Sequence, residues 1–234
     1  MTHLTEINIT ARLVAEGPVV AGKRLRLRDN YAWHKLAWTC FPGIVPDPNK
    51  GRFPKGTKPE DQPKTTPDYL MRLDQRKQDF RLLIVSPIEP TRPDWCPANS
   101  ENWKTKPIPD TYFSRRRYVF QLCANPTKKV KSRSDGSLPK HGRRVPLGKR
   151  EELVEWIKRK GDQGGFTVDE ATLRTFPRGR EYFRKNGQDG LHSAVEFQGV
   201  LTVTDPAKFH ETFTRGIGPA KAFGFGLLVI APIS

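Results

Sequence analysis

The 234-residue sequence predicts an α+β protein of two tandem β-α-β-β-α-β units, which cover residues 1–110 and 111–234. Three observations predict this class. Short segments rich in β-branched and aromatic residues, typical of strands, recur along the chain. A segment with helix-capping and amphipathic signals follows the first predicted strand of each half. The order of elements is similar in the two halves, although they share negligible sequence identity.

The first half opens with a predicted strand and a short helix. Residues 4–14 (LTEINITARLV) alternate and are rich in Ile and Thr, which predicts a strand. Asp29 is a candidate N-cap for a helix over residues 29–40, which Phe41-Pro42 ends. Three side chains of this helix can be placed on or near one apolar stripe: Tyr31, Leu36 and Trp38.

The rest of the first half combines a hairpin with irregular segments. Residues 42–67 are rich in Pro, Lys and Gly, which indicates a long loop or insertion. Residues 69–74 and 80–86 resemble two strands of a hairpin, and residues 87–110 are Pro-rich and irregular. The second helix of this unit therefore has the weakest sequence support.

The second half repeats the order. Residues 116–124 alternate as a strand and precede a basic loop over 125–147. Residues 149–160 form an amphipathic helix, 164–184 have room for a further strand, and 192–204 predict a strong strand. The apolar face of the helix is expected to carry Leu153, Trp156 and Ile157.

A glycine-rich loop near the C-terminus, GIGPAKAFGFGLLVI (216–230), separates a predicted helix (205–215) from a last strand (223–230). Nucleotide-binding P-loops and Rossmann loops run in the opposite order, from strand to helix, which argues against a nucleotide fold. Two interpretations stay open: a tight turn that needs positive φ, or a backbone that approaches a large phosphate ligand closely. With this loop each half completes the ferredoxin-like order of elements.

The net charge of +16 is concentrated in one segment. Residues 115–160 carry 15 basic and 4 acidic side chains. Such a concentration favours a polyanionic partner, above all nucleic acid, because each Lys or Arg placed on a phosphate releases counterions. An anionic membrane surface is less favoured, since the basic residues lie mostly in a Gly/Ser/Pro-rich loop and not along one helix face.

Other classes of protein are excluded by what the sequence lacks. It has no apolar run approaching the ~20 residues of a membrane span and no signal-peptide pattern at its start, so a cytoplasmic protein is expected. The odd count of three widely spaced cysteines argues against a disulfide framework. Carboxylates, histidines and cysteines do not show metal-ligand spacing, so neither a metal nor a cofactor is expected.

Three features stand together: a Tyr-x-x-His pair, Tyr31 and His34, on the first helix, the basic loop, and the glycine-rich loop. This combination resembles the CasE family, the repeat-cleaving endoribonucleases of the type I-E CRISPR Cascade. The similar stretches run from the first helix to the C-terminus and are YAWHKLAWTCFP (31–42), FQLCANPTKK (120–129), RRVPL (143–147), FQGVLTVTD (197–205) and GIGPAKAFGFGLL (216–228).

The resemblance implies two tandem ferredoxin-like, RRM-related domains. It implies metal-independent cleavage at the 3′ base of the CRISPR repeat hairpin, retention of the product, and assembly with the backbone and crRNA-binding subunits of a prokaryotic Cascade. Target DNA would be met only through that complex, and no membrane is involved. Tyr31 and His34 match the family's catalytic pair in type and spacing.

Chemistry independent of the family supports the same pair. RNA carries its own nucleophile, the 2′-hydroxyl. Histidine suits proton transfer because its ordinary pKa lies near neutral pH. Residues three apart on a helix face the same side, so Tyr31 can donate a hydrogen bond beside His34. The remaining expected RNA contacts are Lys35, Lys128, Lys129, Lys131, Arg133, Lys140, Arg143, Arg144, Lys149, Arg150, Lys158, Arg159, Gly216, Gly218, Lys221, Gly224 and Gly226, with Lys160 extending the surface.

Two rival interpretations remain. On spacing alone, a tyrosine and a histidine near two tryptophans are more often packing residues, and the protein would then be a non-catalytic RNA-binding subunit of a ribonucleoprotein. A nucleotide-dependent enzyme would instead bind ATP or GTP at residues 216–226. The other histidines, His3, His141, His192 and His210, are interpreted as structural.

Overall fold

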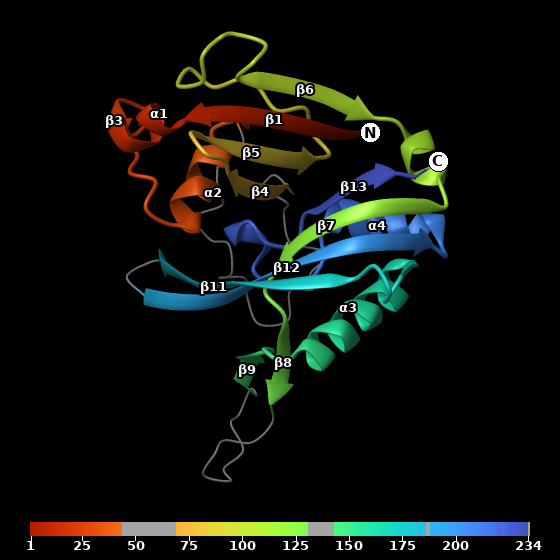
Figure 1. Cartoon of the computed structure of the whole chain (residues 1–234). Coiled ribbons are helices and arrows are strands. Elements are labelled where there is room, and N and C mark those ends of the chain that lie inside the picture. The colour runs from red at the N-terminus through yellow and green to blue at the C-terminus, as the bar shows by residue number, and fades with distance from the viewer. Residues whose placement is uncertain (44–68, 131–142, 186–187, 234) are drawn as a thin grey trace, which may run out of the picture.

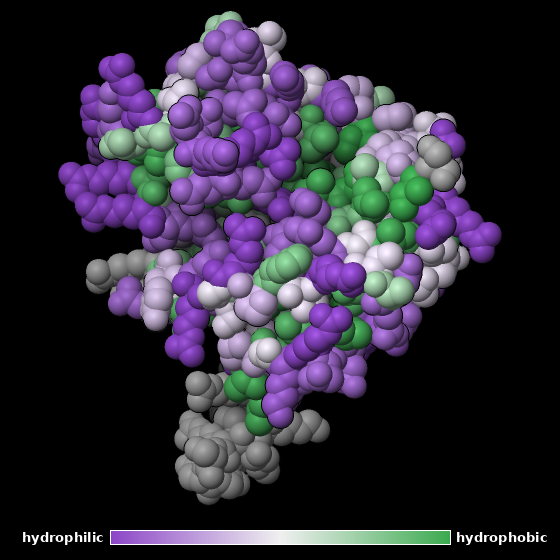
Figure 2. All heavy atoms as spheres, viewed as in Figure 1, coloured by the Kyte–Doolittle hydropathy of each residue, from purple (hydrophilic) through white to green (hydrophobic). Residues whose placement is uncertain are grey.

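The computed structural model describes residues 1–43, 69–130, 143–185 and 188–233; for Arg143, Arg184, Lys185 and Gln188 it describes the backbone alone. Two antiparallel sheets lie one beside the other, and a small hairpin projects from the second (Figure 1). On the face shown in Figure 2, hydrophilic side chains cover most of the surface, and apolar ones gather where the two sheets meet. The expected loop at 42–67 lies almost entirely outside the described residues.

The first sheet consists of four strands, β1 (Thr2–Thr10), β4 (Leu70–Gln75), β5 (Asp79–Ser86) and β6 (Trp103–Ile108). They lie in the order β4-β5-β1-β6. Ile7 of the inner strand β1 is opposite Leu82 on one side and Trp103 on the other. Counted along the chain, this order is 2-3-1-4, which confirms a ferredoxin-like arrangement of strands.

Three expectations for the first half are wrong. The strand expected over 4–14 ends at Thr10, because the Thr10 side chain accepts a hydrogen bond from the Leu13 amide and starts helix α1 (Ala11–Glu16). The second helix of the β-α-β-β-α-β order would follow the strand at 80–86, but segment 87–102, all of which the structure describes, contains no helix. Strand β6 then forms within the stretch 87–110, which was expected to be irregular. A two-residue ribbon, β2 (Val19–Val20) with β3 (Lys23–Arg24), precedes the predicted helix α2 (Asn30–Trp38).

The second sheet consists of five strands, β7 (Arg117–Ala124), β10 (Phe166–Val168), β11 (Arg174–Lys185), β12 (Gln188–Val203) and β13 (Leu228–Pro232). They lie in the order β10-β12-β7-β13, with β11 also paired to β12. The single strand expected within 164–184 is thus two strands that share the same edge of β12, with Phe166 opposite Val203 and Thr175 opposite Phe197. The chain order is again 2-3-1-4.

Helices α3 (Arg150–Gly164) and α4 (Pro206–Arg215) pack on the second sheet. The three side chains expected on the inner face of α3 are buried. The helix runs past its expected end at residue 160 because the residue that terminates it is Gly165, which adopts a left-handed φ of 77°. Asp205 accepts a hydrogen bond from the Lys208 amide and caps α4, as its sequence predicts.

The basic segment expected to be a loop contains a hairpin. Strand β8 (Thr127–Val130) pairs with β9 (Arg143–Pro146), with Lys129 opposite Arg144. In Figure 1 this hairpin extends from the second sheet beside the N-terminal end of α3. The residues between its strands lie outside the described part of the chain.

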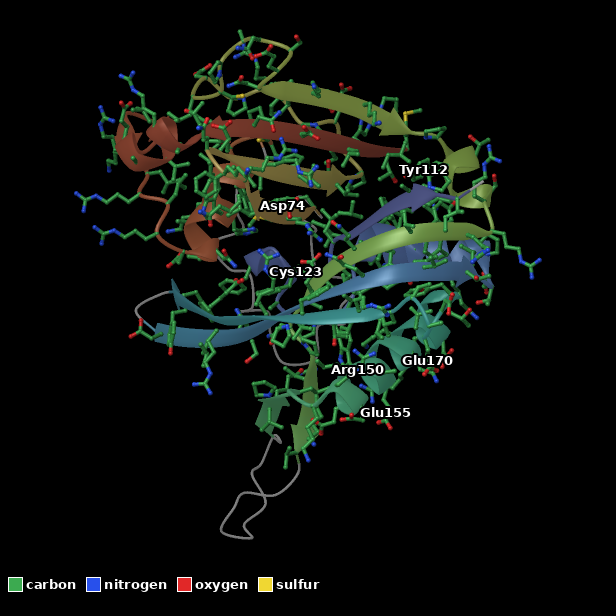
Figure 3. The ribbon with its side chains drawn as sticks, viewed as in Figure 1. Asp74, Tyr112, Cys123, Arg150, Glu155 and Glu170 are labelled. Carbon is green, nitrogen blue, oxygen red and sulfur yellow. The ribbon has the colours of Figure 1, made fainter. Side chains whose placement is uncertain are left out.

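One buried hydrophobic cluster includes residues of both sheets, and a second lies between the first sheet and α2. Leu70 and Val85 of the first sheet belong to the same buried cluster as Leu122 of the second. A buried ion pair also joins them, with Arg72 Nη2 3.0 Å from Glu196 Oε1. Figure 3 shows Asp74, which accepts a hydrogen bond from Arg72, on the first-sheet side of this junction. Breaking a buried pair on one side leaves an uncompensated charge, so this contact ties the sheets together.

Candidate functional site

Helix α2 carries two stripes with the same spacing of three and four residues. One stripe is buried against the first sheet and consists of Trp33, Leu36 and Ala37, with Cys40 continuing it just after the helix. The other is half-buried or exposed and consists of Tyr31, His34, Lys35 and Trp38. The sequence placed Tyr31 and Trp38 on the apolar stripe; the structure shows instead that they flank His34.

The ring of His34 is surrounded by aromatic groups. Its centroid lies 6.2 Å from that of Tyr31 and 6.0 Å from that of Trp38. Tyr69, directly before β4, also stacks on it, with 5.3 Å between centroids. Lys35 is exposed, and its Nζ lies 4.8 Å from the centroid of the Tyr31 ring. The stripe therefore presents an imidazole, a phenol and an ammonium group together at the surface.

The glycine-rich loop is a tight turn of the expected kind. Its four glycines, at 216, 218, 224 and 226, all have positive φ. The loop closes on itself through a hydrogen bond from the Ile217 amide to the Gly226 carbonyl (2.9 Å). The Gly226 amide in turn donates to the Cys123 carbonyl of β7 (2.8 Å). The turn interpretation is confirmed, and a role toward a ligand is compatible with it.

We expect Gly226→Ala to lower the free energy of unfolding by more than the roughly 1–3 kcal/mol of a strained φ alone. Gly226 has φ of +88°, and a Cβ there would lie 2.6 Å from the Ile217 carbonyl oxygen. Gly22→Ala is the matched control, since Gly22 has φ of +75° but a Cβ added there would meet open space. Urea unfolding of both variants measures the difference; equal losses would contradict the steric argument.

A basic groove of about 660 Å³ lies beside this loop. Four elements form its walls: the β8–β9 hairpin, the C-terminal half of α3, α4 at Thr212, and the first part of the glycine-rich loop. Its lining residues are Thr127, Lys128, Lys129, Arg144, Trp156, Arg159, Lys160, Gln163, Gly164, Thr212, Gly216, Ile217, Gly218, Pro219 and Lys221. The structure thus brings most of the expected cationic residues of known position into one concave surface.

The cations of this groove repel one another. Burial, and then the nearby charges of Arg159 and Arg144, lower the pKa of Lys160. Burial, followed by Arg215 and Lys160, likewise lowers the pKa of Lys221. Burial and repulsion thus disfavour the charged forms of these lysines. The phosphates of a bound polyanion would stabilise the charged forms by supplying negative charge. Of the groove lysines, Lys128 has a carboxylate partner, Glu152, at 2.7 Å.

Several expected RNA contacts lie elsewhere. Lys149 and Arg150 are exposed at the start of α3, outside the groove lining. Lys158 forms an ion pair with Glu170, which Figure 3 shows beside α3. Gly224 and Gly226 shape the turn but do not line the groove. Lys131, Arg133, Lys140 and the side chain of Arg143 are outside the described residues.

One short element joins the groove to helix α2. The 3-10 turn η3 (Lys221–Phe223) lines the groove with its first residue and packs against α2 with its last. The ring centroids of Phe223 and Tyr31 are 6.0 Å apart. Behind Phe223 stand Phe183 and His192 of the β11–β12 hairpin, at 4.2 and 4.8 Å. His192 thus has the packing role expected for it.

Sequence reasoning missed two residues at this centre, Tyr69 and Phe223. Tyr69 contacts His34 across 35 residues of chain, and the intervening segment has no pattern that predicts the contact. Phe223 was assigned to a buried strand, whereas β13 starts only at Leu228. A phenylalanine directly before Gly224, in a stretch of closely spaced glycines, was the one available signal, because such a residue is exposed on a turn unless a neighbour covers it.

Residue types that bind metal ions do not cluster in the described part of the chain: no three His, Cys, Asp or Glu side chains there are placed to share an ion. Within the same residues, no helix is long and apolar enough to cross a membrane.

The sequence matches a family model described as CRISPR associated protein over residues 2–232. It is 28% identical over 211 residues to the CRISPR system Cascade subunit CasE of Escherichia coli, covering 88% of this chain and 94% of the relative. It is 32% identical over 157 residues to the CRISPR-associated endoribonuclease Cse3 of Thermus thermophilus, covering 61% and 70%. A solved structure of Cse3 bound to 19 nt RNA superposes with a TM-score of 0.64 at 26% identity, covering 99% of this chain and all of that one.

Proposed function

The chain belongs to the CRISPR-associated protein family that contains CasE and Cse3, and from this premise we propose that it is the endoribonuclease that processes precursor CRISPR RNA. It binds the hairpin of the CRISPR repeat and cleaves at the 3′ base of the stem. It then stays bound to the product as a Cascade subunit in the prokaryotic cytoplasm, in contact with the backbone subunits and with target DNA only through the complex. The relatives' names and the RNA-bound structure of Cse3 support this proposal.

One observation carries the proposal. The basic groove and the Tyr31/His34 stripe meet through η3, which lines the groove at Lys221 and contacts Tyr31 at Phe223. The groove fits the phosphates of an A-form stem, which proteins recognise mainly through backbone and shape. An RNA held there has its strand directed along the loop toward α2.

The chemistry needs no more than these side chains and the RNA itself. His34 takes the proton of the 2′-hydroxyl while the oxygen of that hydroxyl forms a bond to the adjacent phosphorus. The bond from phosphorus to the 5′ oxygen breaks, leaving a 2′,3′-cyclic phosphate and, after proton uptake, a 5′-hydroxyl. Lys35 and Tyr31 lie beside His34, where an ammonium and a phenol O–H stabilise the charge that develops on the phosphoryl oxygens.

We also propose that the two units divide at residues 110/111. This position falls at the start of the short 3-10 helix η2 (Asp110–Ser114), which connects β6 of the first sheet to β7 of the second. Each unit then contributes one part of the site: the imidazole comes from the first and the groove from the second.

A labelled RNA hairpin with the repeat of the protein's own CRISPR array tests the function in a single-turnover assay with EDTA. We expect one cut at the 3′ base of the stem, with a 2′,3′-cyclic phosphate on one product and a 5′-hydroxyl on the other. Binding without a 5′-hydroxyl product would instead identify a non-catalytic RNA-binding subunit. Loss of cleavage in EDTA would overturn the metal-independent mechanism.

A further inference from the structure

The side chain of Tyr69 makes two contacts with one residue. Its hydroxyl oxygen lies 2.8 Å from His34 Nδ1 and 2.9 Å from the backbone carbonyl oxygen of His34. Both distances are those of normal hydrogen bonds. A phenol has one proton to donate and lone pairs with which to accept, so the two contacts cannot both be donations from Tyr69.

Two aromatic neighbours fix the position of the Tyr69 ring. It stacks on Phe41 with 5.1 Å between centroids, and on the imidazole of His34 with 5.3 Å between centroids. Burial, with a smaller contribution from Cys40, raises the pKa of the Tyr69 phenol, so the hydroxyl keeps its proton at neutral pH. Tyr69 is therefore a fixed, neutral partner for whichever form of the imidazole is present.

The backbone carbonyl decides the direction of both hydrogen bonds. A carbonyl oxygen can only accept, so the Tyr69 O–H donates to it. The remaining contact then requires Nδ1 of His34 to donate to the phenol oxygen, which fixes the proton of a neutral imidazole on Nδ1. The other ring nitrogen, Nε2, is left with its lone pair, the form that a general base needs.

We propose that Tyr69 is a positioning residue that holds His34 as the Nδ1–H tautomer, so that Nε2 is the atom that removes the proton from the 2′-hydroxyl. This inference rests on the proposed function for its catalytic part. The hydrogen-bonding part stands on the geometry of the free protein and is measured there.

The tautomer is read directly by nitrogen NMR of the free full-length protein, with the His34 ring signals assigned by their loss in His34→Ala. At a pH where the ring is neutral, we expect a pyrrole-type shift for Nδ1 and a pyridine-type shift for Nε2. In Tyr69→Phe, which keeps the stacked ring, the pattern is expected to move toward the Nε2–H form. A pyridine-type Nδ1 in the parent protein would overturn the proposal.

Cleavage by Tyr69→Phe tests the consequence. We expect the single-turnover rate to fall about 10- to 100-fold, a part of the ~10²–10⁴-fold that acid–base catalysis supplies, with hairpin affinity unchanged. Tyr112→Phe is the matched control, since Tyr112 also donates its hydroxyl proton to a backbone carbonyl, that of Ile230 (2.6 Å). Figure 3 shows Tyr112 at the opposite end of the first sheet from α2. The control should cleave at the parental rate.

The outcomes separate the two proposals. A parental rate in Tyr69→Phe would overturn the positioning role even if the function is correct. A parent protein that binds the hairpin but never cleaves it would overturn the function, while the NMR result would still decide the tautomer. A fall in the cleavage rate of Tyr112→Phe equal to that of Tyr69→Phe would mean that removing any tyrosine hydroxyl has the same effect, which also overturns the proposal.

Discussion

Replacing His34 with alanine is expected to lower the single-turnover rate of hairpin cleavage by about 10²–10⁴-fold and to leave hairpin binding unchanged. In the proposed mechanism the imidazole is the proton-transferring group of the stripe, whereas affinity comes from the separate groove, where cations meet phosphates. The helix should survive the change, because Tyr69 bonds the backbone carbonyl of residue 34 as well as its side chain. A gel-shift titration and a single-turnover time course measure the two quantities.

His210→Ala is the control for this experiment. His210 packs on Phe113, with ring centroids 4.6 Å apart, on helix α4 and outside the lining of the groove. The substitution removes an imidazole from a structural position, so the His210→Ala variant should cleave at the parental rate. If His34→Ala cleaves as fast as the parent does, the assignment of the catalytic stripe is wrong.

The double variant Lys160→Ala/Lys221→Ala is expected to weaken hairpin binding about 100-fold. Each side chain is half-buried in the groove among other cations, and a hydrogen bond to a charged group is worth roughly 1.5–3 kcal/mol. Two such interactions total at least about 3 kcal/mol, or two factors of ten at ~1.4 kcal/mol each. The slope of log affinity against log salt should also fall, by about 0.9 for each phosphate that the variant no longer neutralises.

A matched variant separates this local effect from the lower net charge. Lys23→Ala/Lys104→Ala removes the same charge from exposed positions on the first half, outside the groove lining. It should retain most of the affinity and salt dependence. Equal reductions in the two double variants would show that the groove has no special role. Unfolding of the groove variant should need no less urea than the parent, because its lysines repel their neighbours.

Short sequence patterns predicted those parts of the site whose structure depends on residues close together in the chain. Asp29 caps α2, the amphipathic face of α3 is buried, and the glycines of the C-terminal loop adopt positive φ, each set by a few neighbouring residues. Helix α2 shows the limit of such patterns. Two stripes of that helix have the same spacing, and only packing against the first sheet decides that Trp33 is buried and Trp38 is not.

Interactions between distant segments could not be predicted in the same way. Tyr69 reaches His34 only because the start of β4 lies against α2, and Arg72 reaches Glu196 only because the two sheets share a junction. The hairpin of β8 and β9 was not predicted, because Lys and Arg dominate the segment and side chains of this kind do not indicate strands. Its strands pair through the backbone. In each case the determining interaction joins residues that no short sequence window contains.

The shape of η3 has a consequence for how this protein can change. Lys221 faces the groove and Phe223 faces Tyr31, with a single residue between them. Under the proposed function, a substitution that refits the loop to a different repeat also displaces the ring that packs against α2, the helix that carries His34. Substitutions that adapt the protein to new repeat sequences are therefore expected to accumulate in the β8–β9 hairpin and on α3, where the fit to RNA can change without disturbing the chemistry.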